Sequence, residues 1–258
     1  MQMIKFVADI IITLTVWIYF IFGYLLFFSP FHAVAFLFSK DPETAFQYLN
    51  HIYFKSFFAL IRIITPGIKF DIDKDIYSIQ RSVIICNHLS YLDPIFLVSL
   101  FKKQKTIVKS SFFSLPIFGW LLKTSGYIPS STGRNLTDLM IKNIENIQEY
   151  ITSGGVIFVF PEGTRNSNRE IGSFGKGAFS IAKQSNSPIK VLFISSTDKL
   201  FHPGKFLFNT CIKNTIKIEL LATIEPDYQS DDFSVSGLMK DVRTVLELCN
   251  AETLHKNV

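Results

Sequence analysis

Two short groups of polar residues could carry chemistry, because each follows an apolar run that is typical of a buried strand. Residues 87–93 (NHLSYLD) follow 82–86 (SVIIC), and residues 160–165 (FPEGTR) lie at the end of 156–160 (VIFVF). Open α/β sheets place their ligands at the carboxyl ends of buried strands. We therefore expect both groups to lie at the same edge of one sheet.

The first group contains His88 and Asp93, residue types suited to proton transfer. On a straight helix, side chains five positions apart diverge by roughly 140°, so this pair needs a turn to meet. Pro94 suits such a turn, with Asp93 at the start of the helix that follows. The carboxylate could then fix the imidazole tautomer, and His88 could take a proton from a substrate hydroxyl. Alternatively, Asp93 only caps the helix and His88 is a solvated loop residue.

The second group combines a turn with a cation. Gly163 allows a tight turn, and Arg165 offers a planar fork that suits a phosphate. Glu162 is expected to orient that fork or to accept a hydrogen bond from a substrate. Lys176 lies in a glycine-rich loop, residues 172–177, which enters a helix and suits an anion. A salt-bridged turn and an ordinary surface loop are the alternatives.

The elements that must position these groups alternate along the chain. Apolar runs typical of buried strands cover 82–86, 106–108, 156–160, 189–195 and 215–224. Helical spacing of apolar residues covers 41–64, 94–101, 135–152, 177–184 and 233–249, and Asp41-Pro42 is a typical helix start. This order predicts an α/β fold with a mixed, largely parallel sheet flanked by helices on both faces.

The first 40 residues differ from the rest in being strongly apolar. Residues 10–28 carry no charge, and as a helix they reach about 28 Å, close to the thickness of a bilayer core. Ser29-Pro30 should break that helix before a second apolar stretch at 31–38. We expect a kinked membrane helix or a helical hairpin. A secretory signal peptide is the alternative, although the run is long for one and no good cleavage site follows it.

Composition narrows the range of partners. The chain has 258 residues, 27 of them Phe, a net charge of +5 and a pI near 9.0. A basic, apolar-rich protein suits an anionic membrane surface or an anionic substrate. We do not expect a nucleic-acid partner, because zinc-ligand spacing, helix-turn-helix patterns and aromatic RNA-binding signatures are missing. Three scattered cysteines, Cys86, Cys211 and Cys249, argue against a disulfide framework and fit a reducing compartment.

Together the motifs N-H-L-S-Y-L-D and F-P-E-G-T-R, some seventy residues apart, resemble the glycerolipid acyltransferase family, whose best-known members are the lysophosphatidic acid acyltransferases. The family pattern, H-x-x-x-x-D followed by F-P-E-G-T-R, is matched without gaps. Stretches 116–126 and 176–179 look like further blocks of the family. The resemblance covers roughly residues 70–200. It implies an α/β acyltransferase domain at 41–258 behind a membrane anchor at 1–40.

The resemblance also implies roles for single residues. His88 would be the general base and Asp93 its partner, and Arg165 would hold a phosphate. The other residues expected to bind substrate are Asn87, Glu162, Gly163, Thr164 and Lys176. The donor would be a thioester of coenzyme A or acyl carrier protein, a co-substrate rather than a bound cofactor, and no metal is expected. The acceptor would be a lysophospholipid, above all 1-acylglycerol-3-phosphate, at the cytoplasmic face of the inner membrane.

Two departures from the family pattern leave the acceptor open. Thr132 stands where the family usually has an arginine, with Arg134 nearby, and Pro188 is followed by Val191 where P-x-x-P is common. A different lysolipid, an ornithine-type lipid or a sterol-like alcohol could be the acceptor instead. Two different functions also stay open, those of a thioester hydrolase and of a non-catalytic lipid-binding protein. The chain has no G-x-S-x-G motif, so we expect direct attack by the acceptor without an enzyme nucleophile.

Overall fold

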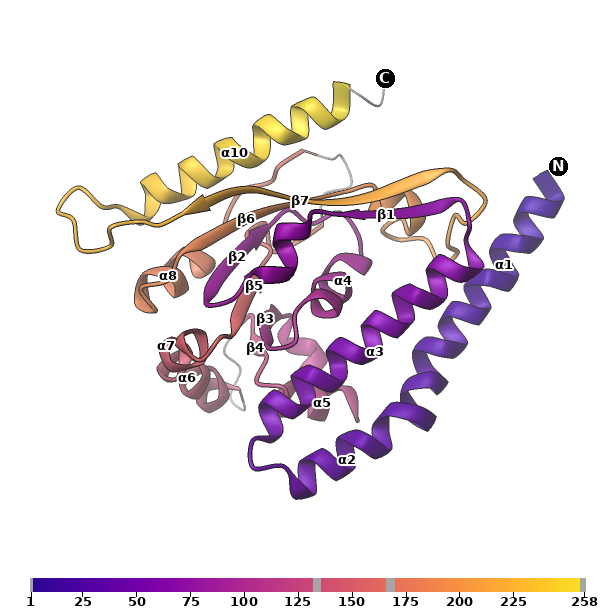
Figure 1. Cartoon of the computed structure of the whole chain (residues 1–258), viewed down its shortest axis with the longest axis horizontal. Helices are drawn as coiled ribbons and strands as arrows, with labels where there is room; N and C mark the ends of the chain where they lie inside the picture. Colours follow the sequence, from indigo (N-terminus) through magenta and orange to yellow (C-terminus); the bar gives the residue numbers. More distant parts are fainter. Residues whose placement is uncertain (1, 132–135, 166–169, 256–258) are drawn as a thin grey trace.

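Seven strands form one mixed sheet in the order β1-β7-β6-β2-β5-β3-β4 (Figure 1). The structure is a computed structural model that describes residues 2–131, 136–165 and 170–255. Neighbouring strands run parallel except for the antiparallel pair β6–β7. The predicted α/β fold with a largely parallel sheet is therefore confirmed. The strands are β1 Ile68–Ile72, β2 Ser82–Cys86, β3 Gln104–Val108, β4 Ile128–Pro129, β5 Val156–Val159, β6 Ile189–Ser195 and β7 Asn214–Ile224.

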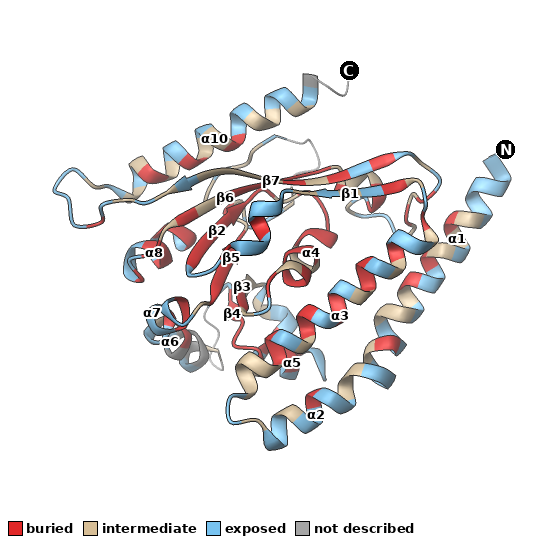
Figure 2. Cartoon of the chain, in the orientation of Figure 1, coloured by how far each residue is buried: buried red, intermediate tan, exposed pale blue. Residues whose placement is uncertain are grey.

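Two separate apolar cores cover the two faces of the sheet. Successive side chains of a strand point to opposite faces, so Ile84 and Cys86 of β2 join the core beneath α3 and α4, while Val83 and Ile85 join the core beneath α7, α8 and α10. Figure 2 shows β2 and β5 as buried strands at the centre of these layers. Burial on both faces explains why SVIIC and VIFV read as continuous apolar runs.

The helices largely follow the predicted order. They are α3 Pro42–Ile64, α4 Leu92–Leu100, α5 Phe118–Thr124, α6 Thr137–Glu145, α7 Ile147–Thr152, α8 Gly177–Gln184, α9 Thr197–Leu200 and α10 Val235–His255, with short 3-10 helices η2 Lys74–Ser78 and η3 Ser110–Ser114. The Asp41 carboxylate accepts a hydrogen bond from the Thr44 N–H at 3.1 Å, which confirms the predicted start of α3.

The prediction of one helix over 135–152 is wrong in the part that the structure describes. Helices α6 and α7 are separated at Asn146, whose φ of −93° and ψ of 7° leave the helical range. The interruption lets Ile147, Tyr150 and Ile151 of α7 enter the second core together. Strand β1 was not predicted, because its sequence IKFDI mixes charged and apolar residues on a partly exposed edge.

The N-terminal segment is one long helical run that contains α1 Gln2–Ile18, the π-helical η1 Tyr19–Phe28 and α2 Ser29–Phe38. The predicted break at Ser29-Pro30 is wrong, because Pro30 lies in the first turn of α2, where a missing N–H is tolerated. Figure 1 shows the run bending between α1 and α2. Of the two predicted forms, the structure therefore has a bent helix and not a hairpin within residues 2–38.

This helical run is long and apolar enough to cross a membrane by length and composition. Only 17% of its most apolar window is buried inside the protein, and Figure 2 shows much of α1 and α2 as exposed. A core helix of a soluble domain would be mostly buried. The low burial distinguishes this run from such a core helix.

The inward face of α1 carries polar side chains that bond to the α/β domain. The Asp9 carboxylate accepts hydrogen bonds from the main-chain N–H and the hydroxyl of Thr210, at 2.8 and 2.6 Å. The Thr13 hydroxyl accepts a hydrogen bond from the Phe208 N–H at 2.9 Å. All three bonds are buried, so they fix both the position and the rotation of α1 against the segment 208–210.

We expect the substitution Thr13→Val to destabilise the protein by about 1–3 kcal/mol, because it leaves the buried Phe208 N–H without an acceptor. Thr15→Val is the matched control. Thr15 lies on the exposed side of the same helix and bonds only within it, so its effect should stay within about 0.5 kcal/mol. Denaturant unfolding in a fixed detergent measures both. Equal effects of the two substitutions would contradict the docking that we describe.

Candidate active site

The side chains of His88 and Asp93 face each other across the loop between β2 and α4. The distance from His88 Nδ1 to Asp93 Oδ2 is 2.9 Å. The same oxygen accepts hydrogen bonds from the main-chain N–H groups of Leu89 and Ser90, at 2.6 and 2.7 Å. Helix α4 begins at Leu92, so Asp93 lies in its first turn. The predicted turn, and the pairing that depends on it, are confirmed.

These contacts define the state of the imidazole. Because Asp93 Oδ2 acts as the acceptor, the neutral imidazole carries its proton on Nδ1, and Nε2 is then its acceptor nitrogen. The ring also stacks on Phe160, with centroids 4.3 Å apart and 24° between the planes. The His88 side chain is 13% exposed and that of Asp93 is fully buried. The ring is thus held from two sides, and its free nitrogen is suited to accept a proton.

Thr197, which the sequence analysis did not identify, completes the surroundings of Asp93. Its hydroxyl donates a hydrogen bond of 2.6 Å to Asp93 Oδ1, the oxygen that does not bond to His88. Thr197 follows β6, the direct neighbour of β2 in the sheet. The sequence did contain a pattern that points to Thr197, because polar residues follow the predicted strand 189–195 just as they follow the strands 82–86 and 156–160. The sequence alone could not show that this strand lies beside β2.

The loop that carries His88 is fixed at two further points. The Asn87 side-chain amide donates to the Ile194 carbonyl at 2.8 Å and accepts from the Ile194 N–H at 2.7 Å. The Ser90 hydroxyl donates to the Phe201 carbonyl at 2.7 Å. Asn87 therefore extends the pairing of β2 with β6 and sets the direction in which the loop leaves the sheet. A contact between Asn87 and substrate stays a prediction.

Glu162 links the second motif directly to the first. Its carboxylate accepts hydrogen bonds from the His88 N–H at 3.3 Å and from the Gly172 N–H at 2.8 Å. The turn that presents it contains Gly163, whose φ of +67° favours glycine and whose N–H donates to the Phe160 carbonyl at 3.1 Å. Burial raises the pKa of Glu162, although the bonds from Gly172 and His88 oppose the shift.

Arg165 of the second motif also contacts the first motif. Its guanidinium carbon lies 3.4 Å from the centroid of the Tyr91 ring, in the same loop as His88. A stacked guanidinium keeps its N–H edge for an anion. Thr164 is exposed beside it, and Lys176 is exposed at the start of α8. The substrate contacts predicted for these two residues stay predictions.

Cys86, directly before the site, is fully buried, and burial raises the pKa of its thiol well above the ordinary value. A thiolate nucleophile is therefore disfavoured at this position. Within the described residues, no group of three or more His, Cys, Asp or Glu side chains could hold a metal ion. The family's usual arginine position, Thr132, and the nearby Arg134 lie outside the described residues.

A solved structure and curated sequences are similar to this chain. The crystal structure of the 1-acyl-sn-glycerophosphate (LPA) acyltransferase PlsC from Thermotoga maritima aligns over 95% of this chain and 97% of that one, with a TM-score of 0.71 and 19% identity. At that identity the alignment supports the fold, including the long N-terminal helix.

Two similar curated relatives are named 1-acyl-sn-glycerol-3-phosphate acyltransferases. A chloroplastic enzyme of Brassica napus is 33% identical over 47% of this chain and 35% of its own length. An enzyme of Saccharomyces cerevisiae is 33% identical over 49% of this chain and 43% of its own length. The chain thus spans less than half of either relative. The Acyltransferase family model matches residues 67–195, half of the chain, which includes both motifs. The chain is a member of the Acyltransferase family.

Proposed function

We propose that the protein transfers a fatty acyl chain from an acyl thioester to the free hydroxyl of a lysophospholipid, above all 1-acylglycerol-3-phosphate. The observation that carries the proposal is the His88–Asp93 pair, in a loop whose Tyr91 ring stacks against the Arg165 guanidinium. The names of the relatives support both the reaction and the acceptor.

The chemistry follows from the state of the imidazole. A lipid hydroxyl is a poor nucleophile, so His88 Nε2 takes its proton as the oxygen attacks the thioester carbonyl. Asp93 stabilises the imidazolium that forms. The tetrahedral intermediate then breaks its C–S bond, and the imidazolium returns the proton to the leaving thiolate. General-base help of this kind accelerates a reaction by about 10²–10⁴-fold. The products are the diacyl lipid and the free thiol.

Arg165 is the group we assign to the acceptor phosphate. Guanidinium binds phosphate through two parallel N–H donors, and the stack on Tyr91 holds the fork in place before the lipid arrives. Since Tyr91 belongs to the same loop as His88, the stack would link the position of the bound phosphate to that of the base. Thr164 and Lys176 would contact the same end of the acceptor.

The donor and the location complete the proposal. Either coenzyme A or acyl carrier protein would supply the thioester, because the chemistry at His88 needs only an activated carbonyl. The apolar run Gln2–Phe38 would hold the protein at the inner membrane, with the site on the cytoplasmic side. An acceptor that already resides in the bilayer would then reach the site without leaving the interface.

The His88→Ala substitution should lower acyl transfer by about 10²–10⁴-fold, because the attacking hydroxyl loses its base. His202→Ala is the matched control, since His202 is an exposed histidine, and it should keep full activity. Purified protein is assayed with labelled palmitoyl-coenzyme A and palmitoyl carrier protein against a panel of lysolipids. Unchanged transfer by His88→Ala would refute the mechanism, and thioester hydrolysis indifferent to every lysolipid would indicate a hydrolase instead.

Arg165→Ala should raise the KM for 1-acylglycerol-3-phosphate by at least about tenfold, since one charge-assisted phosphate contact is worth roughly 1.5–3 kcal/mol. The KM for the acyl donor should change little. Initial rates at varied acceptor and fixed donor, then the reverse, separate the two effects. If the substitution changes only the donor KM, Arg165 binds the thioester donor and not the acceptor phosphate.

Glu162→Gln tests the buried carboxylate through pH. A raised folded-state pKa means that the contribution of Glu162 to stability is fully present below its unfolded pKa and is lost as pH rises through its folded pKa. Gln does not ionise, so the difference in stability between Glu162→Gln and wild type should shift in favour of the variant from about pH 4 upward and then level off. Urea unfolding at several pH values measures this difference. A flat difference would contradict the raised pKa.

A further inference from the structure

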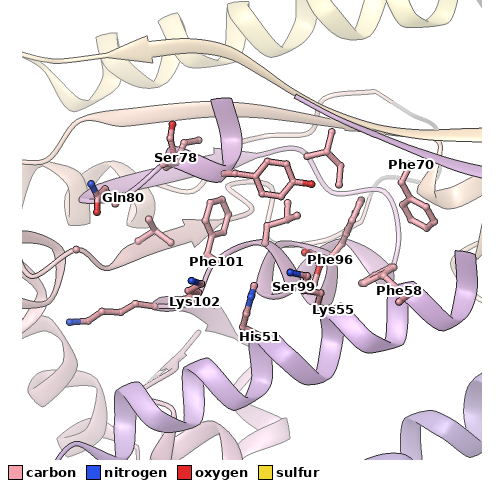
Figure 3. Close-up of a pocket in the computed structure, with 18 of the residues that line it drawn as sticks. His51, Lys55, Phe58, Phe70, Ser78, Gln80, Phe96, Ser99, Phe101 and Lys102 are labelled. Atoms are coloured by element: carbon pink, nitrogen blue, oxygen red, sulfur yellow. Dashed lines mark hydrogen bonds between the residues drawn. The ribbon is translucent and has the colours of Figure 1, made fainter. Parts of the chain in front are cut away.

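A cavity of about 790 Å³ lies at the edge of the sheet opposite His88 (Figure 3). Its lining includes Gln80, Lys103 and Gly154, which precede the parallel strands β2, β3 and β5. His88 follows the carboxyl end of β2, and five strand residues span roughly 17 Å. The cavity is therefore separate from the proposed catalytic site. Its volume is in the range of small-molecule sites, about 300–1,000 Å³.

One wall of the cavity is a cluster of aromatic rings. Phe58 of α3, Phe70 of β1 and Phe96 of α4 contact one another, with ring centroids 4.6 to 5.9 Å apart. Ile79 and Phe101 continue the apolar lining. Figure 3 shows Phe58, Phe70 and Phe96 together on one side of the cavity. A wall of this kind suits a hydrocarbon chain.

The lining also contains four cationic side chains. Lys55, Arg62, Lys102 and Lys103 line the cavity, and no Asp or Glu belongs to its described lining. Lys103 bonds to Ser153, whereas none of the ion pairs between described residues involves the other three cations. Cations gathered without acids create a potential that attracts an anion.

A buried histidine lies between the two kinds of surface. His51 is 7% exposed and lines the cavity, and its Nδ1 has no hydrogen-bond partner among the described residues. Burial lowers the pKa of His51; a hydrogen bond with the Val98 main chain opposes this shift, and the charges of Lys55 and Lys102 add to it. A buried polar atom without a partner is rare in proteins and needs an explanation. A ligand head group would supply the partner.

We propose that this cavity binds an anionic lipid with a single chain, its carboxylate or phosphate beside His51, Lys55 and Lys102 and its chain against Phe58, Phe70 and Phe96. A free fatty acid and a lysophospholipid share this chemistry. Both carry a negative charge, which the cations of the lining attract, and a hydrocarbon chain, which fits against the aromatic wall. The proposal concerns binding and does not depend on the reaction at His88.

The test uses the full chain in phosphatidylcholine nanodiscs and a palmitate probe with a photoreactive group on its chain. Cross-links mapped by mass spectrometry should fall within 51–62, 70–80 and 96–103. Palmitate or 1-palmitoyl-lysophosphatidate should compete at least about tenfold better than hexadecanol, which lacks the charge, and whichever acts at lower concentration identifies the source. Labelling that misses all three of these segments would overturn the proposal, as would equal competition by hexadecanol or by inorganic phosphate alone.

Charge reversal gives the second arm. The double variant Lys55→Glu/Lys102→Glu should lose at least about fivefold of the labelling, because two favourable charges become repulsive. Lys183→Glu/Lys240→Glu, on exposed positions of α8 and α10, is the matched control and should keep it. His88→Ala should also label normally. Equal losses in the test and control variants would overturn the proposal, and thermal unfolding midpoints show that all variants are folded.

Discussion

The buried carboxylate of Asp93 is the group on which the rest of the site depends. It accepts hydrogen bonds from His88, Leu89 and Ser90 on one oxygen and from Thr197 on the other. A buried carboxylate is tolerated only when its oxygens accept hydrogen bonds from nearby donors. The five-residue loop therefore has one low-energy shape, the one in which every donor points inward. The same shape turns the imidazole toward the open side of the sheet.

Three neighbouring strands cooperate to make this arrangement. Strand β2 supplies the loop with the base, β5 supplies Phe160 and Glu162, and β6 leads to Thr197. Because β2 and β6 run parallel to each other, as do β2 and β5, their carboxyl ends meet at one edge. The site is thus held by sheet geometry, whereas the side chains of Thr164 and Lys176 are exposed beside it.

Much of this could be predicted from the sequence, for physical reasons. Buried strands such as 82–86 appear in the sequence as apolar runs. Pro94 indicated that a helix starts near Asp93, so that the Asp93 carboxylate can fold back onto His88. The role of Glu162 in holding the His88 main chain and the stack of Arg165 on Tyr91 could not be predicted, because both join residues more than 70 positions apart. The order of strands in the sheet places Thr197 beside Asp93, and strand order leaves no trace in local sequence pattern. The division of α6 from α7 was also decided by the core.

The polar stripe on α1 has a consequence for how the protein meets its surroundings. Asp9 and Thr13 satisfy main-chain groups of the segment 208–210, while Trp17 packs against Phe201 and Phe208. A generic apolar sequence could replace the exposed half of this helix but not its inner half. Deleting this helix would expose the apolar side chains beneath it and leave the main-chain N–H groups of Phe208 and Thr210 without acceptors. The helix is therefore a structural part of the folded domain.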